Sequence, residues 1–158
     1  MATKKPGSLI ISSSAFENEG SIPAKYTCEG EEINPPLHVD NIPDDTQTLA
    51  IIVEDPDAPK GTFDHWLVWN IPPEGSIEEN RIPGISGING AGKTGYYGPC
   101  PPSGSHRYYF HVFALDKSLD VEAGIRKGAL QKAMEPHILA KGSFMGRYQR
   151  SDKSRKAV

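Results

Sequence analysis

The sequence predicts a mainly β fold with one short helical element near the C-terminus. Several short segments alternate apolar and polar residues or run almost entirely apolar, which is the pattern of strands. The chain has 16 glycines and 14 prolines in 158 residues, enough for many turns but too few to indicate disorder. This length fits a single domain, 1–158, and we expect its core to span about residues 8–150 with flexible ends.

Six segments have the composition and period of strands. They are Leu9–Ser12, Pro36–Asp40, Thr48–Glu54, Phe63–Ile71, His106–Leu115 and Ser143–Gln149. Thr48–Val53 and Trp66–Ile71 are almost unbroken apolar runs, which is typical of strands that are covered on both faces. These two strands should therefore be central.

The strand expected at His106–Leu115 carries polar residues on both faces. A period of two puts His106 and Tyr108 on one face, and Arg107, Tyr109 and His111 on the other. We interpret His111, in the middle of the strand, as a structural residue.

One helix is predicted, from about Arg126 to Ala140. Pro136 should kink it or divide it, because an interior proline removes a hydrogen bond and clashes with the preceding turn. His137 is expected to pack in the core or to cap the helix. Residues 76–93 show no period and many glycines, so they predict a long surface excursion.

Charge and hydropathy exclude several classes of protein. The formal net charge is −3, and no basic stripe with interleaved aromatic residues indicates nucleic-acid binding. The basic residues near the two ends are expected to be solvated: Lys4, Lys5, Lys153, Arg155 and Lys156. The N-terminal segment has no apolar run long enough for a signal peptide or a membrane span, so we expect a cytoplasmic protein.

The two cysteines, Cys28 and Cys100, make no disulfide framework by their number. In a reducing cytosol we expect two free thiols, with Cys100 packed as a small apolar residue and not acting as a reactive thiol. The alternative is a bridge that pins the loop at Cys28 to the proline-rich loop at Cys100.

Two polar segments are the candidates for a functional site. One is Asp55-Pro56-Asp57-Ala58-Pro59, with His65 at the head of the next strand. The other is the loop Gly98–Pro102, which leads into His106 and Tyr108. Prolines stiffen such a loop, and glycines let backbone N–H groups approach a ligand.

Leaving polar groups buried without partners costs about 1–3 kcal/mol each, so the two segments should face each other and a ligand. Asp55 and Asp57 are then expected to raise the pKa values of the histidines and to keep them cationic. His65 and His106 bind an anion in this interpretation. The loop adds backbone N–H groups, and Tyr108 adds an O–H.

Together these motifs resemble the phosphatidylethanolamine-binding protein family, which includes Raf kinase inhibitor proteins, and more particularly its bacterial and archaeal branch. The resemblance runs from about Ser8 to Arg150. It implies an antiparallel Greek-key β-sandwich-like fold with a short C-terminal helical element. It also implies an anion pocket, and we expect the following ligand-binding residues: Asp55, Asp57, His65, Gly98, Cys100, Pro101, His106 and Tyr108.

The resemblance implies two further features. Family members often have a cis peptide bond in the Asp-Pro-Asp-Ala-Pro turn, so a cis bond is expected at Ala58–Pro59. The pocket of the family accepts phosphate or phosphorylated amines such as phosphoethanolamine, and some members inhibit kinases or serine proteases. The expected ligand is therefore a small anion or a phosphorylated head group.

The function predicted from these observations is that of a non-enzymatic binding protein without catalytic residues, metal or cofactor. It would regulate or inhibit a kinase or a serine protease. The alternative is an enzyme that uses the His/Asp cluster for metal binding or acid/base catalysis. Against it, the chain has no His-x-x-x-His spacing and no serine on a Gly-x-Ser-x-Gly turn. A scaffold with a vestigial pocket is a third interpretation, and the oligomeric state, a homodimer included, stays open.

Overall fold

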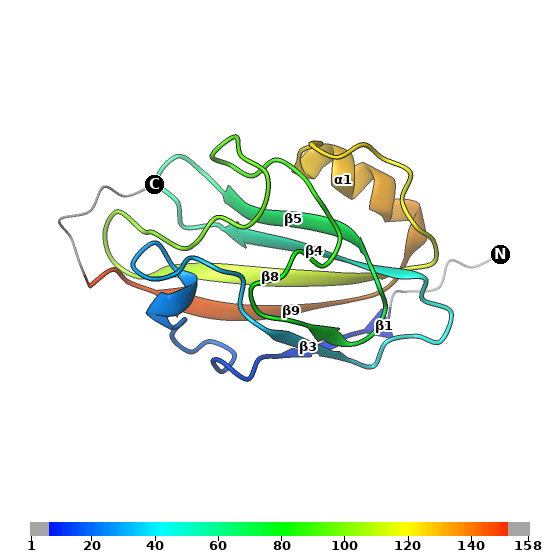
Figure 1. Cartoon of the computed structure of the whole chain (residues 1–158), viewed down its shortest axis with the longest axis horizontal. Coiled ribbons are helices and arrows are strands. Elements are labelled where there is room, and N and C mark those ends of the chain that lie inside the picture. Colours follow the sequence, from blue (N-terminus) through cyan, green and yellow to red (C-terminus); the bar gives the residue numbers. More distant parts are fainter. Residues whose placement is uncertain (1–6, 152–158) are drawn as a thin grey trace.

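Two β-sheets form the framework of the protein, for which the computed structural model describes residues 7–151 (Figure 1). The larger sheet has the strand order β1 (Gly7–Ser8), β9 (Ile138–Tyr148), β8 (His106–Leu115), β4 (Thr48–Asp55), β5 (Phe63–Ile71) and β7 (Ile85–Ser86). The smaller sheet has the order β2 (Ile10–Ser12), β3 (Leu37–Asp40) and β6 (Ser76–Ile77). The helices are η1 (Ala24–Tyr26), α1 (Lys127–Met134) and η2 (Glu135–His137).

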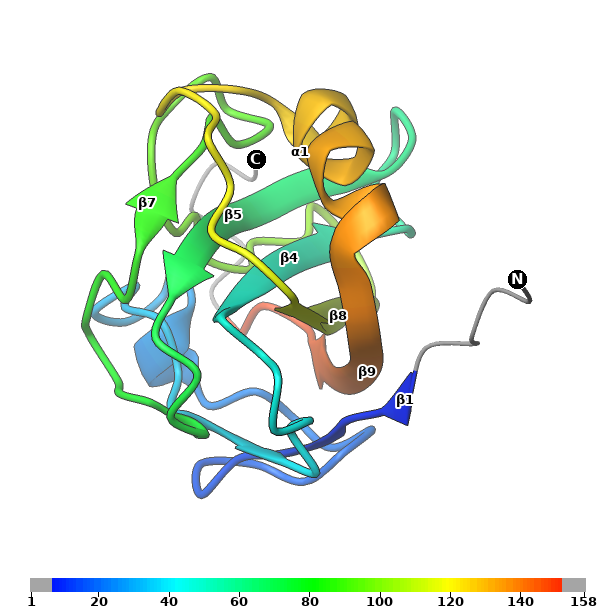
Figure 2. The ribbon, with the colours of Figure 1, turned by 90° about the vertical axis from the view of Figure 1, so that its right-hand side faces the viewer.

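The large sheet is covered on both faces. Figure 2 shows α1 on one side of it and the blue and cyan segments of the small sheet on the other. Ile51 of β4 belongs to the core between the sheets, and its neighbour Ile52 belongs to the cluster under α1. The unbroken apolar runs of β4 and β5 are thus explained, and the prediction that these strands are central is confirmed.

The structure corrects three expectations about the fold. The large sheet is mixed and not purely antiparallel, because β1 pairs in parallel with β9 through Gly7↔Ala140. The helix ends at Met134, and Pro136 lies in the following 3-10 turn, which agrees with the predicted interruption. β9 already begins at Ile138, where helix was expected, because Ile138 pairs with Leu115 of β8. The Greek-key connection pattern stays a prediction.

Some elements left no readable pattern in the sequence. The strands β6 and β7 lie in the segment expected to be a surface excursion, and each has only two residues, too few to show a period. The basic residues at the two ends, which are Lys4, Lys5, Lys153, Arg155 and Lys156, lie outside the described residues. Between residues 7 and 151, no helix has the length and the hydropathy needed to cross a membrane. The cytoplasmic location stays a prediction.

The pairing of β4 with β5 contains a bulge that matters for function. Val53 pairs with Trp66 and Glu54 with Asp64, so His65 is an extra residue between two paired positions. A bulge of this kind turns a side chain away from its regular face. It gives His65 an orientation that strict alternation along β5 does not predict.

Substitution of Trp69 tests the packing between the large sheet and α1. The side chain is fully buried beside Leu130 and Met134. Trp69→Ala should lower the free energy of unfolding by about 3–5 kcal/mol, measured by urea denaturation, because a large cavity opens in the core. The control is Ile82→Ala, since Ile82 is 80% exposed. A loss at Trp69 of only about 0.5 kcal/mol, which is usual for surface substitutions, would contradict the packing described here.

Candidate functional site

The two predicted polar segments meet at one end of the large sheet. Asp55, at the end of β4, and His106, at the start of β8, are 51 residues apart, yet Asp55 Oδ2 lies 2.7 Å from His106 Nδ1. Antiparallel pairing of β4 with β8 brings these two strand ends side by side. Both side chains are buried, and a carboxylate can only accept, so His106 donates from Nδ1 and its Nε2 is left for another partner.

His65 is held differently from His106. Its Nδ1 lies 2.6 Å from the backbone oxygen of Tyr97, so the ring donates to a carbonyl and not to a carboxylate. Burial lowers the pKa of His65 and outweighs this hydrogen bond and the charge of Asp55, which both act to raise it. The expectation that carboxylates keep both histidines cationic is therefore wrong for His65, which is neutral at neutral pH.

Tyr108 contacts both imidazole rings. Its ring centroid lies 5.2 Å from that of His65, edge to face, and 6.4 Å from that of His106, nearly parallel. The residue is 0% exposed, and its hydroxyl makes no hydrogen bond of good geometry with the described residues, although the Asp55 carboxylate is close enough to interact with it. Burial, followed by the charge of Asp55, raises the pKa of Tyr108, and hydrogen bonding toward Asp55 acts in the same direction, so the hydroxyl keeps its proton and remains a donor. His106 and Tyr108 share one face of β8, as predicted.

The sequence led us to expect that Asp57 faces the histidines, but in the structure it does not. Its Oδ2 accepts hydrogen bonds from the backbone N–H and the Nε of Arg107, both at 2.9 Å, and its Oδ1 accepts from a terminal nitrogen of Arg107 at 2.7 Å. These bonds, above all those from the guanidinium, lower the pKa of Asp57 to about 2. Asp57 thus holds Arg107 at the start of β8 and stabilises this strand end next to the site.

The proline-rich loop is anchored by a disulfide. Cys100 is bonded to Cys28, with 5.5 Å between their Cα atoms, so the expectation of two free thiols is wrong and the alternative holds. The loop and its partner also exchange a backbone hydrogen bond from Cys28 N to Pro99 O, at 3.2 Å. The two cysteines are 72 positions apart in the chain, so no local sequence pattern indicates that they pair.

Two other groups hold this loop, and neither was found from the sequence. The backbone N–H of Gly98 donates to Glu32 Oε2 at 3.1 Å, and Arg150 Nε donates to the oxygen of Pro101 at 2.9 Å. A Cβ at Gly98 would lie 3.0 Å from the backbone oxygen of Tyr26, so the loop passes very close to its neighbour. Gly98, Cys100 and Pro101 are thus held rigidly beside the site, and their contact with a ligand stays a prediction.

Two aromatic residues missed in the sequence line the surroundings of His65. The Phe63 ring centroid is 4.9 Å from that of His65, and the Tyr97 ring centroid is 6.1 Å away. Both residues adjoin recognised motifs, so their position next to the site could have been inferred. The Ala58–Pro59 bond is trans, because the described chain contains no cis peptide bond, and the expectation of a cis bond is wrong.

The fold and the site define a class: a mainly β domain of two sheets and one short helix, with a cluster of buried polar side chains at the strand ends. The model of the phosphatidylethanolamine-binding protein family matches residues 12–149. The chain therefore belongs to the phosphatidylethanolamine-binding protein family.

Several relatives and solved structures are similar to this chain. A UPF0098 protein of Pyrococcus horikoshii is 49% identical over 149 residues, which cover 87% of this chain and 75% of the relative. A UPF0098 protein of Archaeoglobus fulgidus is 46% identical over 94% of this chain, which spans only 54% of that relative.

A crystal structure of a phosphatidylethanolamine-binding protein homologue from Chlamydia trachomatis is similar with a TM-score of 0.88 and 40% identity, covering 92% of this chain and 99% of that one. An Escherichia coli member of the same family has a TM-score of 0.82 over 92% of this chain and 100% of its own. At 24% identity, it shows the fold alone.

The Asp57–Arg107 pair generates a prediction about acid stability. The pKa of Asp57 is about 2 in the folded chain against an ordinary value of 3.8. The ionised carboxylate therefore stabilises the folded state, and this stabilisation is fully present at pH values above 3.8. That stabilisation is lost as the pH falls toward 2. Asp57→Asn should therefore be less stable than the wild type at neutral pH and lose less stability between about pH 5 and pH 2. Urea denaturation across this range measures it; equal pH dependence in both proteins would contradict the pairing.

The disulfide generates a second prediction. Because the bridge restricts a long stretch of the unfolded chain, replacing Cys28 and Cys100 together by serine should cost about 2–4 kcal/mol of stability. Alkylation of the unfolded, unreduced protein, followed by mass spectrometry, should find no free thiol, and reduction should expose two. Modification of either cysteine before reduction would show that the bridge is absent.

Proposed function

We propose that the protein is a binding protein whose strand-end site, formed by Asp55, His65, His106 and Tyr108, holds a small phosphorylated or other anionic group. The observation that carries the proposal is the buried Tyr108 hydroxyl, which makes no well-formed hydrogen bond with the described residues, in a ring that contacts both imidazoles and lies beside the carboxylate of Asp55. A buried donor without an acceptor costs free energy that a ligand oxygen would recover. This role needs no cofactor, and no reaction takes place at the site.

The two histidines offer different contacts to such a ligand. When His106 is protonated, Asp55 accepts the hydrogen on Nδ1, and the Nε2–H can donate to an oxygen of the ligand. Neutral His65 donates from Nδ1 to Tyr97, so its Nε2 accepts a hydrogen bond. The site thus suits a group with several acceptor oxygens and one donor. A singly protonated phosphate or a phosphorylated amine has this composition.

The description of the family agrees with this chemistry. Phosphatidylethanolamine carries a phosphate and an amine in its head group, and the family that matches residues 12–149 is named for it. Regulation or inhibition of a kinase or a serine protease is a further part of the proposal, and it rests on the resemblance of the motifs. In this role, the partner protein would contact the rigid neighbouring loop, Tyr96–Pro102, together with the bound ligand.

The alternative enzyme would use the same His/Asp cluster. One contact favours binding over catalysis at this site: Asp57 is committed to Arg107, so it is not free to serve as an acid or base beside His106. The bond from Asp55 to His106 does not decide between the two, because a carboxylate orients a histidine in binding and in catalytic sites alike. In addition, no three histidine, cysteine, aspartate or glutamate side chains within residues 7–151 are grouped so that they could hold a metal ion. Activity assays against phosphate esters would decide between the two.

Tyr108→Phe is the sharpest test of the proposed site. It removes only the hydroxyl and keeps the ring between the histidines, so stability should change little. Affinity for phosphate and phosphoethanolamine, measured by NMR titration at millimolar concentration, should fall roughly tenfold, because the lost bond is made to a charged group.

The matched control is Tyr109→Phe, on the opposite face of β8, which should bind as the wild type does. His106→Ala is a poorer probe, since it leaves the buried Asp55 carboxylate without its partner and destabilises the fold. Unchanged affinity in Tyr108→Phe, or no binding by the wild type, would refute the proposal.

A further inference from the structure

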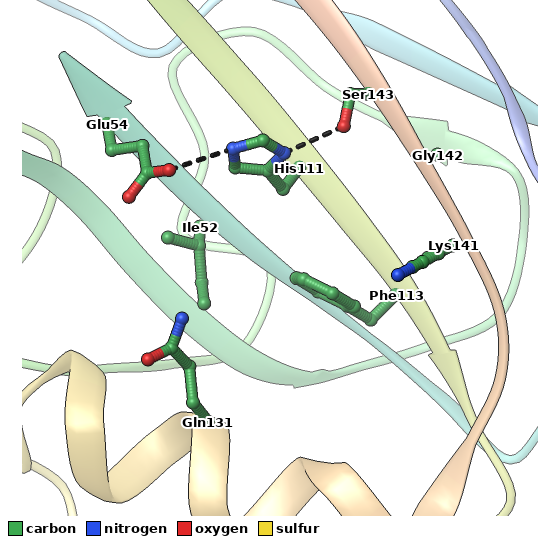
Figure 3. Close-up of a pocket in the computed structure, with 8 residues that line it drawn as sticks. All are labelled: Ile52, Glu54, His111, Phe113, Gln131, Lys141, Gly142 and Ser143. Carbon is green, nitrogen blue, oxygen red and sulfur yellow. Dashed lines mark hydrogen bonds and ion pairs between the residues drawn. The ribbon is translucent and has the colours of Figure 1, made fainter. Parts of the chain in front are cut away.

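A cavity lies on the face of the large sheet that packs against α1 (Figure 3). Its volume is about 490 Å³. Alternate residues of three neighbouring strands line it, because β4, β8 and β9 each turn every second side chain to this face. They include Ile52 and Glu54 from β4, His111 and Phe113 from β8, and Lys141 and Ser143 from β9. We refer to it as the outer cavity.

Three of these side chains form a hydrogen-bonded row. Ser143 Oγ lies 2.7 Å from His111 Nδ1, and His111 Nε2 lies 3.0 Å from Glu54 Oε1. Figure 3 shows the row crossing the three strands above Ile52 and Phe113. The pairing of β8 with β9 sets its geometry, because His111 and Ser143 are directly opposite each other.

The charge of Glu54 fixes the roles of the two imidazole nitrogens. Hydrogen bonds from His111 and from Lys127, whose Nζ is 2.9 Å from Oε2, lower the pKa of Glu54 to about 2. The carboxylate is therefore ionised and can only accept, so His111 donates to it from Nε2. In the form of the ring with a single proton, the Nδ1 lone pair then faces the Ser143 hydroxyl and can accept its hydrogen. A serine is activated as a nucleophile by an adjacent base of this kind.

The imidazole is also fixed in orientation. The Tyr109 ring stacks on it, with 5.7 Å between centroids and 5° between planes. Lys127, which holds the far oxygen of Glu54, is itself held by Asp64 at 2.7 Å. The ring of His111 is thus held in one orientation. Its interpretation from the sequence as a structural residue stays a prediction.

Ser143 is accessible from two sides. Its side chain is exposed, and it also lines a second hollow next to Tyr109 and Met145. A substrate bound across Ser143 would have room for an apolar group over Phe113 on one side and a leaving group on the other. Lys141, two residues before Ser143 on the same face of β9, also lines this cavity, and in Figure 3 its nitrogen lies beside Phe113. It adds a positive charge to the cavity.

We propose that the outer cavity is a hydrolytic site for small carboxylic esters, with Ser143 as nucleophile and His111 as general base. Ser143 Oγ bonds to the ester carbon while its proton passes to His111 Nδ1. This attack gives a tetrahedral oxyanion. The C–O bond to the alcohol then breaks, and the alcohol leaves with the proton from His111. Water, deprotonated by His111, releases the acid and restores Ser143.

This inference goes beyond the proposed function and does not rest on it, because the strand-end site lies on the opposite face of β8. Glu54 acts through His111 and is a positioning residue. The absence of a Gly-x-Ser-x-Gly turn does not bear on it, since the row is assembled by strand pairing and not by a local turn.

The test uses the full chain, p-nitrophenyl acetate and butyrate as substrates, and a fluorophosphonate probe located by peptide mass spectrometry. We expect the probe on Ser143, hydrolysis above the buffer rate, and loss of that excess in Ser143→Ala. His111→Gln should lower kcat about 100-fold or more. Glu54→Gln should lower kcat with KM unchanged, which a merely structural role would not produce.

Ser76→Ala, an exposed serine of the small sheet, is the matched control and should keep the full rate. Ser143 is exposed, so Ser143→Ala should fold, and circular dichroism and the thermal midpoint will verify each variant. Hydrolysis that persists in Ser143→Ala, labelling of Lys141 or another residue in place of Ser143, or no hydrolysis and no labelling by the wild type would each overturn the proposal.

Discussion

The buried hydrogen bond between Asp55 and His106 is the interaction on which the strand-end site depends. It joins two segments 51 residues apart and closes the end of the β4–β8 pair, where both side chains are almost removed from solvent. Removing one partner of such a pair typically costs about 3–5 kcal/mol, because the other is left buried and unpaired. The bond therefore sets the position of His106, the tautomer of its ring and the place of Tyr108 beside it.

The neighbouring histidine shows how backbone geometry changes the chemistry of a residue. The bulge in β5 turns His65 toward Tyr108, and the carbonyl of Tyr97 takes the proton of its Nδ1. Burial then lowers the pKa of His65, while His106 keeps a carboxylate partner. The two histidines look equivalent in the sequence, but they differ in the fold. His65 offers an acceptor nitrogen, and His106, which is paired with a carboxylate, offers a donor. Under the proposed function, this difference would give the site a preference among anions that two cationic histidines would lack.

Much of this arrangement follows from sequence patterns of short range. The apolar runs identified β4 and β5 as central strands, and alternation along β8 placed His106 and Tyr108 on one face. Contacts between distant residues left no such signal: the role of Asp57 depends on the guanidinium of Arg107, and the Cys28–Cys100 bridge depends on how two loops meet. The row of Ser143, His111 and Glu54 is of the same kind, since it exists only through the register of three strands. A bulge and a register are properties of the folded sheet, and a single sequence encodes them only indirectly.

The two faces of β8 therefore have separate roles in this account, with anion binding on the inner face and ester hydrolysis on the outer face. The central claim concerns the inner face, and a crystal structure of the protein grown from phosphate solution tests it most directly. The account predicts tetrahedral density within hydrogen-bond distance of His106 Nε2 and the Tyr108 hydroxyl, with His65 Nε2 at its edge. Phosphate bound only elsewhere, or a structure with the rings of His65 and His106 in separate surroundings, would contradict it.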